Sequence, residues 1–501
     1  MTAILTLGID CGTQGSKVVI FDWNSRQIVS EAYASHTLMT LPNGGKEQDP
    51  LWWIESCQKA INEVLKNTSI DPKTIKAIGV SGQQHGFVPL DTKGDVIRPA
   101  KLWCDTATSA QCEAITEKMG GVEQVIKSIG NSMAVGFTAS KILWLKEMEP
   151  ENYQKLDTIL LPHDYLNYWL TGEKKTEYGD ASGSAYFDVK NRCWSQEILT
   201  SIDESGKLID CLPELIKSEA PAGILRKEIA DEFGLAYDVL VSSGSGDNMM
   251  AAIGTGNVSD GIVTASLGTS GTIYAHASTP VIDPQGELAG FCSGSGSWLP
   301  LVCTMNVTVS TELTRQLLGI NIQELNHLAE QASVGSDGII LLPYFNGERT
   351  PALPQATASL FGINSINYTQ ANLTRSAMEG ATFGLKYGMD VLKKQGIKAE
   401  EIRLVGGGSK SPLWRQIVAD ILDCPVICPV IEEAGALGAA LQAVWCYEQT
   451  KGSNINLKEI TESSVKLDTS KRAEPIKENV ATYSEIFNHY LKLNDALKDL
   501  Y

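Results

Sequence analysis

The chain of 501 residues contains 43% hydrophobic and 20% charged residues, and its formal net charge is −18. This composition is that of an ordinary globular protein and excludes an intrinsically disordered chain. The acidic balance disfavours nucleic acid or an anionic membrane surface as a partner. Because one hydrophobic core rarely organises so long a chain, we expect two domains of about 200 to 250 residues.

No segment predicts a membrane span or an export signal. Apolar runs such as 339–343 are far shorter than the roughly 20 residues that cross a bilayer. The N-terminal residues MTAILTLGID enter a predicted strand without a basic leader. The eleven cysteines have no zinc-ligand spacing and read as reduced, mostly buried residues. We expect a cytoplasmic protein, and the sequence is compatible with a homodimer.

The first element is a strand, a tight glycine turn and a returning strand over residues 5–21. Gly12 and Thr13 lie in its turn, where backbone N–H groups can face an anion. Asp10 precedes the turn, and a carboxylate beside a phosphate site favours an intervening Mg²⁺; the alternative is a residue that caps the turn. Lys17 on the returning strand either reaches the same anion or is a solvated strand lysine.

A helix is expected over 50–66, and a buried strand over 75–80 ends in the loop SGQQHG, residues 81–86. Gln84 and His85 in this loop offer amide and imidazole groups to a polyol, although a purely structural histidine is equally compatible with the sequence. Residues 102–235, rich in Trp, Tyr and turn signals, form an insertion-like region that could supply substrate specificity.

Residues 239–248 (VLVSSGSGDN) form the strongest single candidate site. A buried-type strand breaks into a Ser-Gly-Ser-Gly segment and then presents Asp247 and Asn248 ahead of a helix. An acid at such a strand end can accept a proton from a substrate hydroxyl. The structural alternative is that Asp247 caps the helix that follows.

The second half repeats the pattern of the first. Residues 262–275 again read as strand, glycine turn and strand, with Gly268 and Thr269 in the turn, and residues 402–409 echo 75–82. Gly407 and Gly408 precede a helix expected over 413–422, where helix N–H groups could meet a phosphate, or the turn has no ligand. No GxxxxGK[ST] loop occurs, so a P-loop kinase is disfavoured.

The doubling predicts two similar domains that face one another. We place the N-terminal domain at 1–254 and the C-terminal domain at 255–450. Residues 451–501 are expected to hold a polar linker, over 451–471, and a final amphipathic helix over 483–500. A further helix is expected over 373–394.

Together these segments resemble the FGGY carbohydrate kinases over about residues 4 to 447. Residues 358–379 (ASLFGINSINYTQANLTRSAME) fit the C-terminal signature of that family, and residues 136–147 (GFTASKILWLKE) fit the N-terminal one except at the next residue, Met148. The segments SGQQHG, LWCDTATSAQC, LPHDYLNYWLTG, GDN and YFNGERTP are similar to the branch that phosphorylates D-xylulose. Bacterial members of that branch often have other residues at three places in this sequence: Gln84, His163 and Thr106-Ala107-Thr108. These differences affect which sugar contacts the resemblance implies.

The resemblance implies an α/β fold of two actin-like, ribonuclease-H-type domains around an ATP cleft, with residues 1–254 as the sugar-binding domain and residues 255–450 as the nucleotide-binding domain. It implies ATP-dependent phosphorylation of D-xylulose at its terminal hydroxyl, with Asp247 as the general base and with Gln84, His85 and Asn248 holding the ketose. Asp10 and Asp247 would place Mg²⁺. The implied nucleotide contacts are Gly12, Thr13, Lys17, Gly268 and Thr269 along the triphosphate, and Gly407, Gly408 and Ser411 around the adenosine.

Two other functions remain open at this level. A kinase of the same family could act on another pentulose or polyol, such as ribulose or glycerol. A non-catalytic, actin-like sugar sensor is the alternative outside enzymes, although the pair Asp247-Asn248 and the lack of a basic DNA-binding segment count against it.

Overall fold

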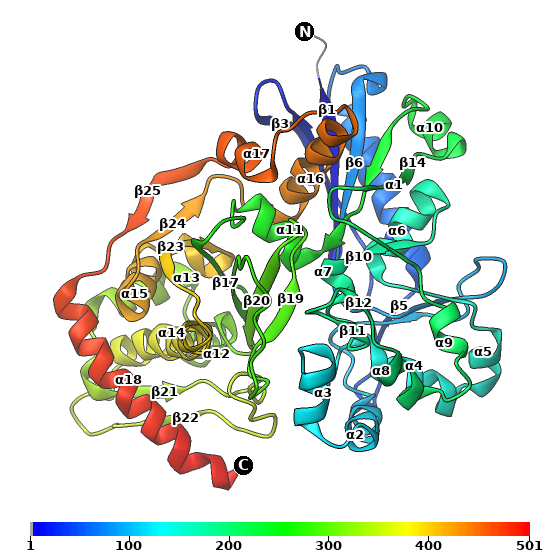
Figure 1. Ribbon diagram of the computed structural model, residues 1–501. Helices are drawn as coiled ribbons and strands as arrows, with labels where there is room; N and C mark the ends of the chain where they lie inside the picture. The colour runs from blue at the N-terminus through cyan, green and yellow to red at the C-terminus, as the bar shows by residue number, and fades with distance from the viewer. Residues whose placement is uncertain (1–3) are drawn as a thin grey trace. The chain divides into compact units, whose positions relative to one another are not determined.

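The computed structural model describes residues 4–501, which pack into two compact units. Unit 1 comprises the chain as far as Val258, together with Ala277–Leu299 and Glu433–Val465. Unit 2 comprises Ser259–His276, Pro300–Glu432 and Lys466–Tyr501. The chain therefore passes between the units several times (Figure 1). The predicted division into 1–254, 255–450 and 451–501 stays a prediction about the domains of the sequence.

Unit 1 is built on a seven-stranded mixed sheet. Its centre is an antiparallel hairpin of β1 (Leu5–Cys11) and β2 (Gly15–Asp22), and β6 (Ile75–Gly82) runs parallel to β1. The remaining strands are β3 (Gln27–Ser35), β14 (Pro221–Ile224), β15 (Leu240–Ser242) and β16 (Ser245–Gly246). Smaller sheets accompany it. One has three strands, β4 (Met39–Thr40), β5 (Lys46–Gln48) and β8 (Ala100–Lys101), and the others are the pairs of β7 (Val88–Leu90) with β9 (Thr158–Leu160), β10 (Lys175–Glu177) with β13 (Glu214–Ile216), and β11 (Phe187–Asp188) with β12 (Cys193–Trp194).

Helices cover both faces of the central hairpin in unit 1. Alternate residues of a strand face opposite sides, and Leu7 and Ile9 pack in one core with Trp53 of α1 (Pro50–Lys66). Thr6, on the other face, donates a hydrogen bond to the carbonyl of Ala440 (3.0 Å) in α16 (Ala434–Thr450). The other helices of unit 1 are α2 (Ser109–Lys118), α3 (Val122–Ile129), α4 (Thr138–Met148), α5 (Pro150–Lys155), α6 (Pro162–Thr171), α7 (Tyr178–Ala181), α8 (Gln196–Ile202), α9 (Lys207–Asp210), α10 (Lys227–Phe233), α11 (Asp247–Gly254) and α17 (Leu457–Ser464).

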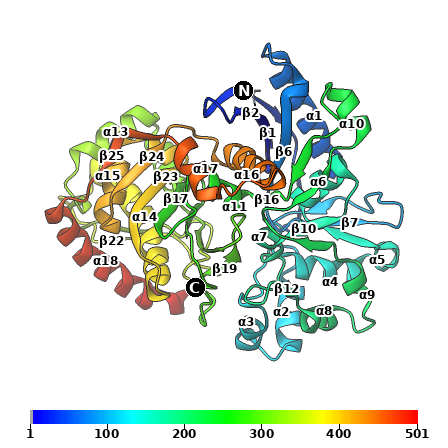
Figure 2. The same cartoon turned by 45° about the horizontal axis from the view of Figure 1, so that its top comes forward.

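The helix α16 approaches β1, β6 and α11 closely because glycines line the contact (Figure 2). A Cβ on Gly8 or Gly79 would overlap backbone atoms of α16, and a Cβ on Gly438 would overlap the carbonyl of Met250 in α11. The missing side chains let the backbones of helix and sheet pack directly. This contact holds a late segment of the sequence against the first strand of the chain.

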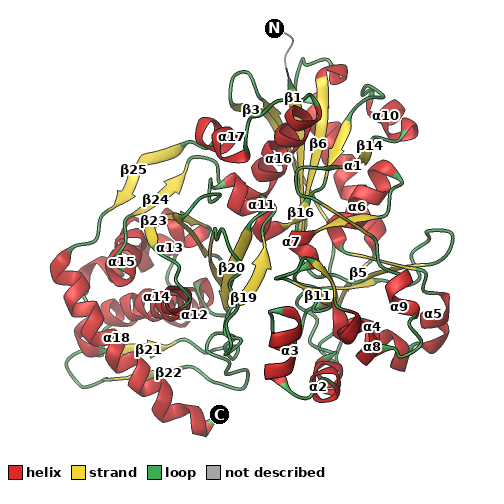
Figure 3. Ribbon diagram, viewed as in Figure 1, coloured by secondary structure: helices red, strands yellow, loops and turns green. Residues whose placement is uncertain are grey.

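Unit 2 repeats the plan of unit 1, as the sequence predicted. The strands β17 (Gly261–Leu267) and β18 (Gly271–Ala275) form an antiparallel hairpin, and β23 (Ala399–Val405) runs parallel to β17 as β6 does to β1. The same sheet includes β20 (Trp298–Thr304), β24 (Val426–Pro429) and β25 (Leu467–Ala473), and its edge strand is β19 (Ala289–Cys292), from the segment Ala277–Leu299. The strand β21 (Ile340–Leu342) pairs with β22 (Ser359–Phe361). Its helices, red in Figure 3, are α12 (Thr308–Leu318), α13 (Ile322–Gln331), α14 (Gln370–Lys394), α15 (Pro412–Leu422) and α18 (Lys477–Leu497).

The expected helices over 50–66, 373–394 and 413–422 are confirmed by α1, α14 and α15. The expected polar linker over 451–471 is wrong, because this stretch holds α17 and most of β25. Asn456 caps α17 through a reciprocal pair of hydrogen bonds with Glu459, a signal of helix start that a polar composition conceals. The final helix begins at Lys477, before the expected 483. Among residues 4–501, no helix is both long and apolar enough to span a bilayer.

Candidate active site in unit 1

Asp10 lies near the end of β1, on the face of the sheet that α16 covers. Ser81 at the end of the parallel strand β6 donates a hydrogen bond to Asp10 Oδ1 (2.6 Å). Gly435, in the first turn of α16, leaves room for the carboxylate, since a Cβ there would overlap its oxygens. Burial raises the pKa of Asp10 to about 6, with a further contribution from Glu433 and an opposing one from Ser81. The carboxyl is thus costly to ionise until a cation approaches.

Asp247 is the first residue of α11, and Gly246 precedes it as the N-cap. Its Oδ1 accepts hydrogen bonds from the backbone N–H (2.7 Å) and the side-chain amide (3.0 Å) of Asn248. Burial raises the pKa of Asp247 to about 7, and the charge of Asp10 raises it further, while Asn248 lowers it. A carboxyl that gives up its proton near neutral pH is suited to act as a general base.

Gln84 and His85 follow β6 and connect to Asn248. Asn248 Nδ2 donates to Gln84 Oε1 (2.6 Å), and Gln84 Nε2 lies 3.5 Å from His85 Nε2. His85 has a left-handed backbone, with φ of 61°, and its carbonyl accepts hydrogen bonds from Lys141 Nζ (2.6 Å) and Thr138 Oγ1 (3.1 Å). The structure therefore brings together Gln84, His85, Asn248 and Asp247, which the sequence analysis had selected from separate segments.

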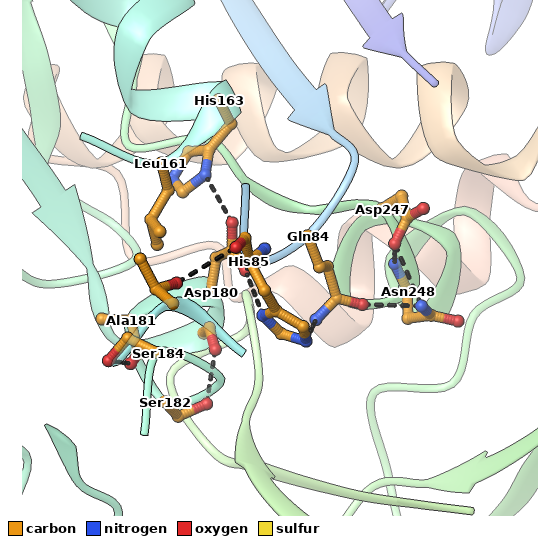
Figure 4. A network of polar contacts seen from close by, with 12 residues as sticks. Gln84, His85, Leu161, His163, Asp180, Ala181, Ser182, Ser184, Asp247 and Asn248 are labelled. Atoms are coloured by element: carbon orange, nitrogen blue, oxygen red, sulfur yellow. Dashed lines mark hydrogen bonds and ion pairs between the residues drawn. The ribbon is translucent and has the colours of Figure 1, made fainter. Parts of the chain in front are cut away.

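Buried acids and a second histidine continue this cluster behind His85 (Figure 4). His85 Nδ1 lies 3.1 Å from Asp180 Oδ1, and His163 Nδ1 lies 3.3 Å from Asp180 Oδ2. Although burial opposes ionisation, hydrogen bonds from His163 and His85 hold the pKa of Asp180 at about 2. Sequence reasoning missed Asp180 as a site residue, since nothing in GDASGSA distinguishes it from a turn aspartate; it had noted His163 only as a difference from relatives.

The loop of Gly12 and Thr13 joins β1 to β2 close to Asp10 in the sequence. The N–H of Gly12 closes the turn on the carbonyl of Gly15 (3.0 Å), and the Thr13 hydroxyl both donates to Gln83 (3.1 Å) and accepts from Trp103 (3.0 Å). These bonds hold the turn in shape. Any anion contact of Thr13 would therefore come from its backbone rather than its hydroxyl.

Lys17 is opposite Asp10 in the β1–β2 register and pairs with acidic side chains. Its Nζ lies 3.3 Å from Glu31 and 3.5 Å from Glu433, which is the N-cap of α16. Both partners are at least partly exposed, so these ion pairs are weak. Lys17 is thus a partly buried cation on the strand paired with that of Asp10, able to exchange its partners for a stronger anion.

Unit 2 carries the remaining predicted nucleotide residues. Gly268 and Thr269 form the β17–β18 turn, and their carbonyls accept hydrogen bonds from Thr308 (2.9 Å) and Val307 (3.0 Å) at the start of α12. Gly407 and Gly408 lie in a 3-10 turn after β23. Ser411 caps α15 by accepting from the N–H of Trp414 (3.3 Å). No Cβ clash limits Gly407, so the backbone there is open to close approach by a flat ligand.

The residues present fit a hydrated Mg²⁺ better than a metal held by protein alone. Within residues 4–501, no three His, Cys, Asp or Glu side chains gather as a metal site. Asp10 and Asp247 lie within electrostatic reach of each other, because the charge of one raises the pKa of the other. Mg²⁺ is commonly held by one or two carboxylates, with water and substrate phosphates completing its coordination.

Two units on one plan, with a carboxyl poised near neutrality among amide and imidazole groups, define a two-domain α/β protein with a candidate acid–base site. The chain belongs to the FGGY family of carbohydrate kinases: the N-terminal domain of that family matches residues 5–254 and the C-terminal domain matches residues 263–447. Its structural relatives have the actin-like ATPase fold.

Individual relatives are similar over nearly the whole chain. A xylulose kinase of Haemophilus influenzae is 45% identical over 97% of this chain and 98% of its own. A crystal structure described as a xyloylose kinase from Brucella ovis is 29% identical, with a TM-score of 0.92 over 99% of this chain and 100% of that one. A gluconate kinase from Lactobacillus acidophilus is 25% identical with a TM-score of 0.91, over 99% of this chain and 98% of that one. The fold is thus shared by kinases that are named for different sugars.

Proposed function

We propose that the protein transfers the γ-phosphoryl group of ATP to the terminal hydroxyl of D-xylulose, forming D-xylulose 5-phosphate. The observation that carries the proposal is the cluster of Asp247, Asn248, Gln84 and His85, which joins one poised carboxyl to three hydrogen-bonding side chains. The likeness to the xylulose kinase of Haemophilus influenzae supports the choice of sugar.

In this proposal Asp247 accepts the proton of the attacking hydroxyl. Asn248, Gln84 and His85 hold the other hydroxyls of the ketose, so the reacting oxygen is presented in line to the phosphoryl group. Phosphoryl transfer needs positioning and charge neutralisation more than covalent chemistry. The raised pKa of Asp247 matches the task, since a base with a pKa near the working pH combines availability with proton affinity.

The nucleotide is proposed to bind through backbone amides of both units. Gly12, Thr13 and Lys17 in unit 1 and Gly268 and Thr269 in unit 2 would contact the triphosphate, with Gly407, Gly408 and Ser411 around the adenosine. Asp10 and Asp247 would hold Mg²⁺, whose charge neutralises the phosphates. With a net charge of −18 on the chain, phosphate binding must depend on such local donors and a metal. Free ketose and ATP meet in the cytoplasm, where we expect the protein to act, and the homodimer stays a prediction for light scattering.

The test is ADP release, measured with D-xylulose, D-ribulose, glycerol and gluconate in parallel. We expect the highest kcat/KM with D-xylulose, and Asp247→Asn should lower kcat by about two to four orders of magnitude, the span of general-base loss. The matched control is Asp157→Asn, a half-exposed aspartate that pairs with Lys174 in the same unit. Preference for another acceptor would replace D-xylulose in the proposal, and sugar binding without turnover by the wild type would favour a sensor.

A further inference from the structure

The two ring nitrogens of His85 face groups of different kinds. Nδ1 lies 3.1 Å from Asp180 Oδ1, and the same oxygen accepts the backbone N–H of His85 (3.2 Å). An ionised carboxylate only accepts hydrogen bonds, and the hydrogen bonds from both histidines hold the pKa of Asp180 at about 2 against its burial. Nδ1 is thus the ring nitrogen of His85 that faces an acceptor, and this favours a proton on Nδ1.

His163 provides the charge that balances Asp180. Its Nδ1 lies 3.3 Å from Asp180 Oδ2 and its Nε2 lies 3.0 Å from Asp164 Oδ1, so both nitrogens face carboxylates. Burial lowers the pKa of His163, but the two carboxylates outweigh it and raise the pKa well above the usual value. His163 is thus a buried cation between two anions, and His85 need not be charged to satisfy Asp180.

The opposite side of the His85 ring gives the same assignment independently. Asn248 Nδ2 donates to Gln84 Oε1 (2.6 Å), which turns the Gln84 amide nitrogen toward His85 Nε2. An amide nitrogen only donates, so this long contact favours an Nε2 that is an acceptor without a proton. Both neighbours of the ring favour the neutral Nδ1–H tautomer.

We propose that Asp180, balanced by His163, is a positioning residue that fixes His85 as the neutral Nδ1–H tautomer and so presents Nε2 as a hydrogen-bond acceptor to the substrate. The contact with substrate rests on the function proposed above, whereas the tautomer does not. In the complex, a sugar hydroxyl donates to Nε2 in place of the distant Gln84 amide. A carbonyl or carboxylate oxygen at that position has no proton to donate, so an acceptor Nε2 selects a substrate with a hydroxyl group there.

Hydrogen bonds to the backbone of His85 also fix the position of its ring. Asp180 Oδ1 binds the N–H of His85, while Lys141 and Thr138 bind its carbonyl. His85 therefore keeps the left-handed conformation that a residue with a side chain seldom adopts. With the backbone fixed and Nδ1 facing Asp180, the ring turns Nε2 toward the Gln84 side chain.

The experiment is ¹⁵N NMR of the full chain labelled at its six histidines, with no ligand, at pH 7. A His85→Gln variant assigns the His85 signals. We expect His85 nitrogens of a neutral ring protonated on Nδ1 and His163 nitrogens of a doubly protonated ring. Asp180→Ala should give His85 signals averaged between tautomers and lower kcat/KM for the ketose about tenfold or more, with the KM for ATP unchanged within about twofold.

Two further variants separate positioning from general structure. In Asp180→Asn the amide oxygen can still accept from His85, so this variant should keep the Nδ1–H tautomer and more of the ketose kcat/KM than Asp180→Ala. Asp157→Ala removes a carboxylate of the same unit outside the cluster and should change neither the His85 signals nor kcat/KM.

The wild-type spectrum alone can overturn the proposal, even if the Asp180 variants fail to fold. A His85 ring protonated on Nε2, or on both nitrogens, would contradict it. An Asp180→Ala protein with an unchanged His85 spectrum and unchanged kcat/KM would contradict it as well. If the wild type phosphorylates no ketose, the proposed function fails by the ADP assay, while the tautomer is still decided by the spectrum.

Discussion

The pKa values of buried carboxyls in this protein shift in opposite directions because their neighbours differ. Asp180 and Glu177 are both fully buried, yet the pKa of Asp180 is held at about 2 while burial raises that of Glu177 to about 7. Asp180 bridges two histidines, whereas Glu177 accepts hydrogen bonds from neutral donors, the hydroxyl of Ser245 and backbone N–H groups, and the charge of His163 lowers its pKa without an ion pair between them. Neutral donors do not offset the desolvation of a charge as a cation does. The charge state of each acid is therefore set by its nearest partner.

Glu348 in unit 2 gives a stability prediction from the same reasoning. It is buried and accepts from the N–H groups of Met305 (2.7 Å) and Arg349 (2.8 Å), and burial raises its pKa from 4.5 to about 7. Between pH 4.5 and 7 the unfolded chain loses this proton while the folded chain keeps it, so stability falls as pH rises through that window and levels off above it. The loss amounts to about 3 kcal/mol.

Urea unfolding of the wild type and of Glu348→Gln at pH 5 and pH 8 checks this. The variant has no proton to lose, so its stability relative to the wild type should improve by up to about 3 kcal/mol from pH 5 to pH 8. Parallel changes in the two proteins would show that Glu348 is ionised in the folded state.

Gly183 should control the position of the His85 ring. A Cβ on Gly183 would overlap Cε1 of His85, although its backbone conformation suits alanine. Gly183→Ala should therefore displace the ring and raise the KM for the ketose about tenfold or more, with the KM for ATP nearly unchanged. Gly294→Ala is the control, since its nearest neighbours stand at an ordinary 3.4 Å. Steady-state kinetics that show equal effects of the two substitutions would contradict this.

The sequence allowed prediction of one side of the candidate site. Gln84, His85, Asp247 and Asn248 each follow a strand that ends in glycine or serine, and a strand end is a local pattern. Asp180 and Lys141 reach His85 from the short helix α7 and from α4, far along the chain. Their roles depend on tertiary contacts, which no local pattern records. The roles assigned to Asp10, Lys17 and the glycine turns stay predictions.

At the scale of elements, the sequence predicted the two hairpins and their parallel partner strands because turn glycines and apolar runs are local signals. It did not predict that α16 covers the sheet of unit 1. Residues 434–450 are rich in alanine and glycine and buried over most of their length, which is typical of a helix packed on all sides. Which sheet it covers is decided by steric fit, through glycines that lie far away in the sequence.

The glycine contacts of α16 give a prediction with an internal control. Gly438→Ala places a methyl group against the carbonyl of Met250, and we expect a loss of about 3 kcal/mol or more in unfolding free energy, in the upper range for overpacking. Gly384→Ala, in α14, meets its nearest neighbour at 3.8 Å and should be neutral or stabilise by up to about 1 kcal/mol through helix propensity. Calorimetric melting of both variants would decide, and equal melting shifts would contradict close packing.

At the scale of the molecule, the proposed triphosphate contacts are divided between the units. Gly12 and Thr13 belong to unit 1, and Gly268 and Thr269 to unit 2. Ligands that contact both turns must favour whichever arrangement brings the turns to one nucleotide. We expect small-angle scattering to give a smaller radius of gyration with D-xylulose and a non-hydrolysable ATP analogue than without ligands. D-xylulose alone is the control, and an unchanged radius at saturation would contradict closure.

The late position of α16 has a consequence for synthesis on the ribosome. The hairpin β1–β2 and the strand β6 leave the exit tunnel early, but the helix that covers their glycine-lined face begins only at Ala434. At about 5–20 residues per second, the stretch from Val258 to Ala434 takes roughly 10 to 35 s to translate. During that time the glycine-lined sheet face of the nascent first half lacks its covering helix. The translation of α16 therefore determines when the sheet of unit 1 can complete its folding. Until then, chaperones have time to bind the uncovered sheet.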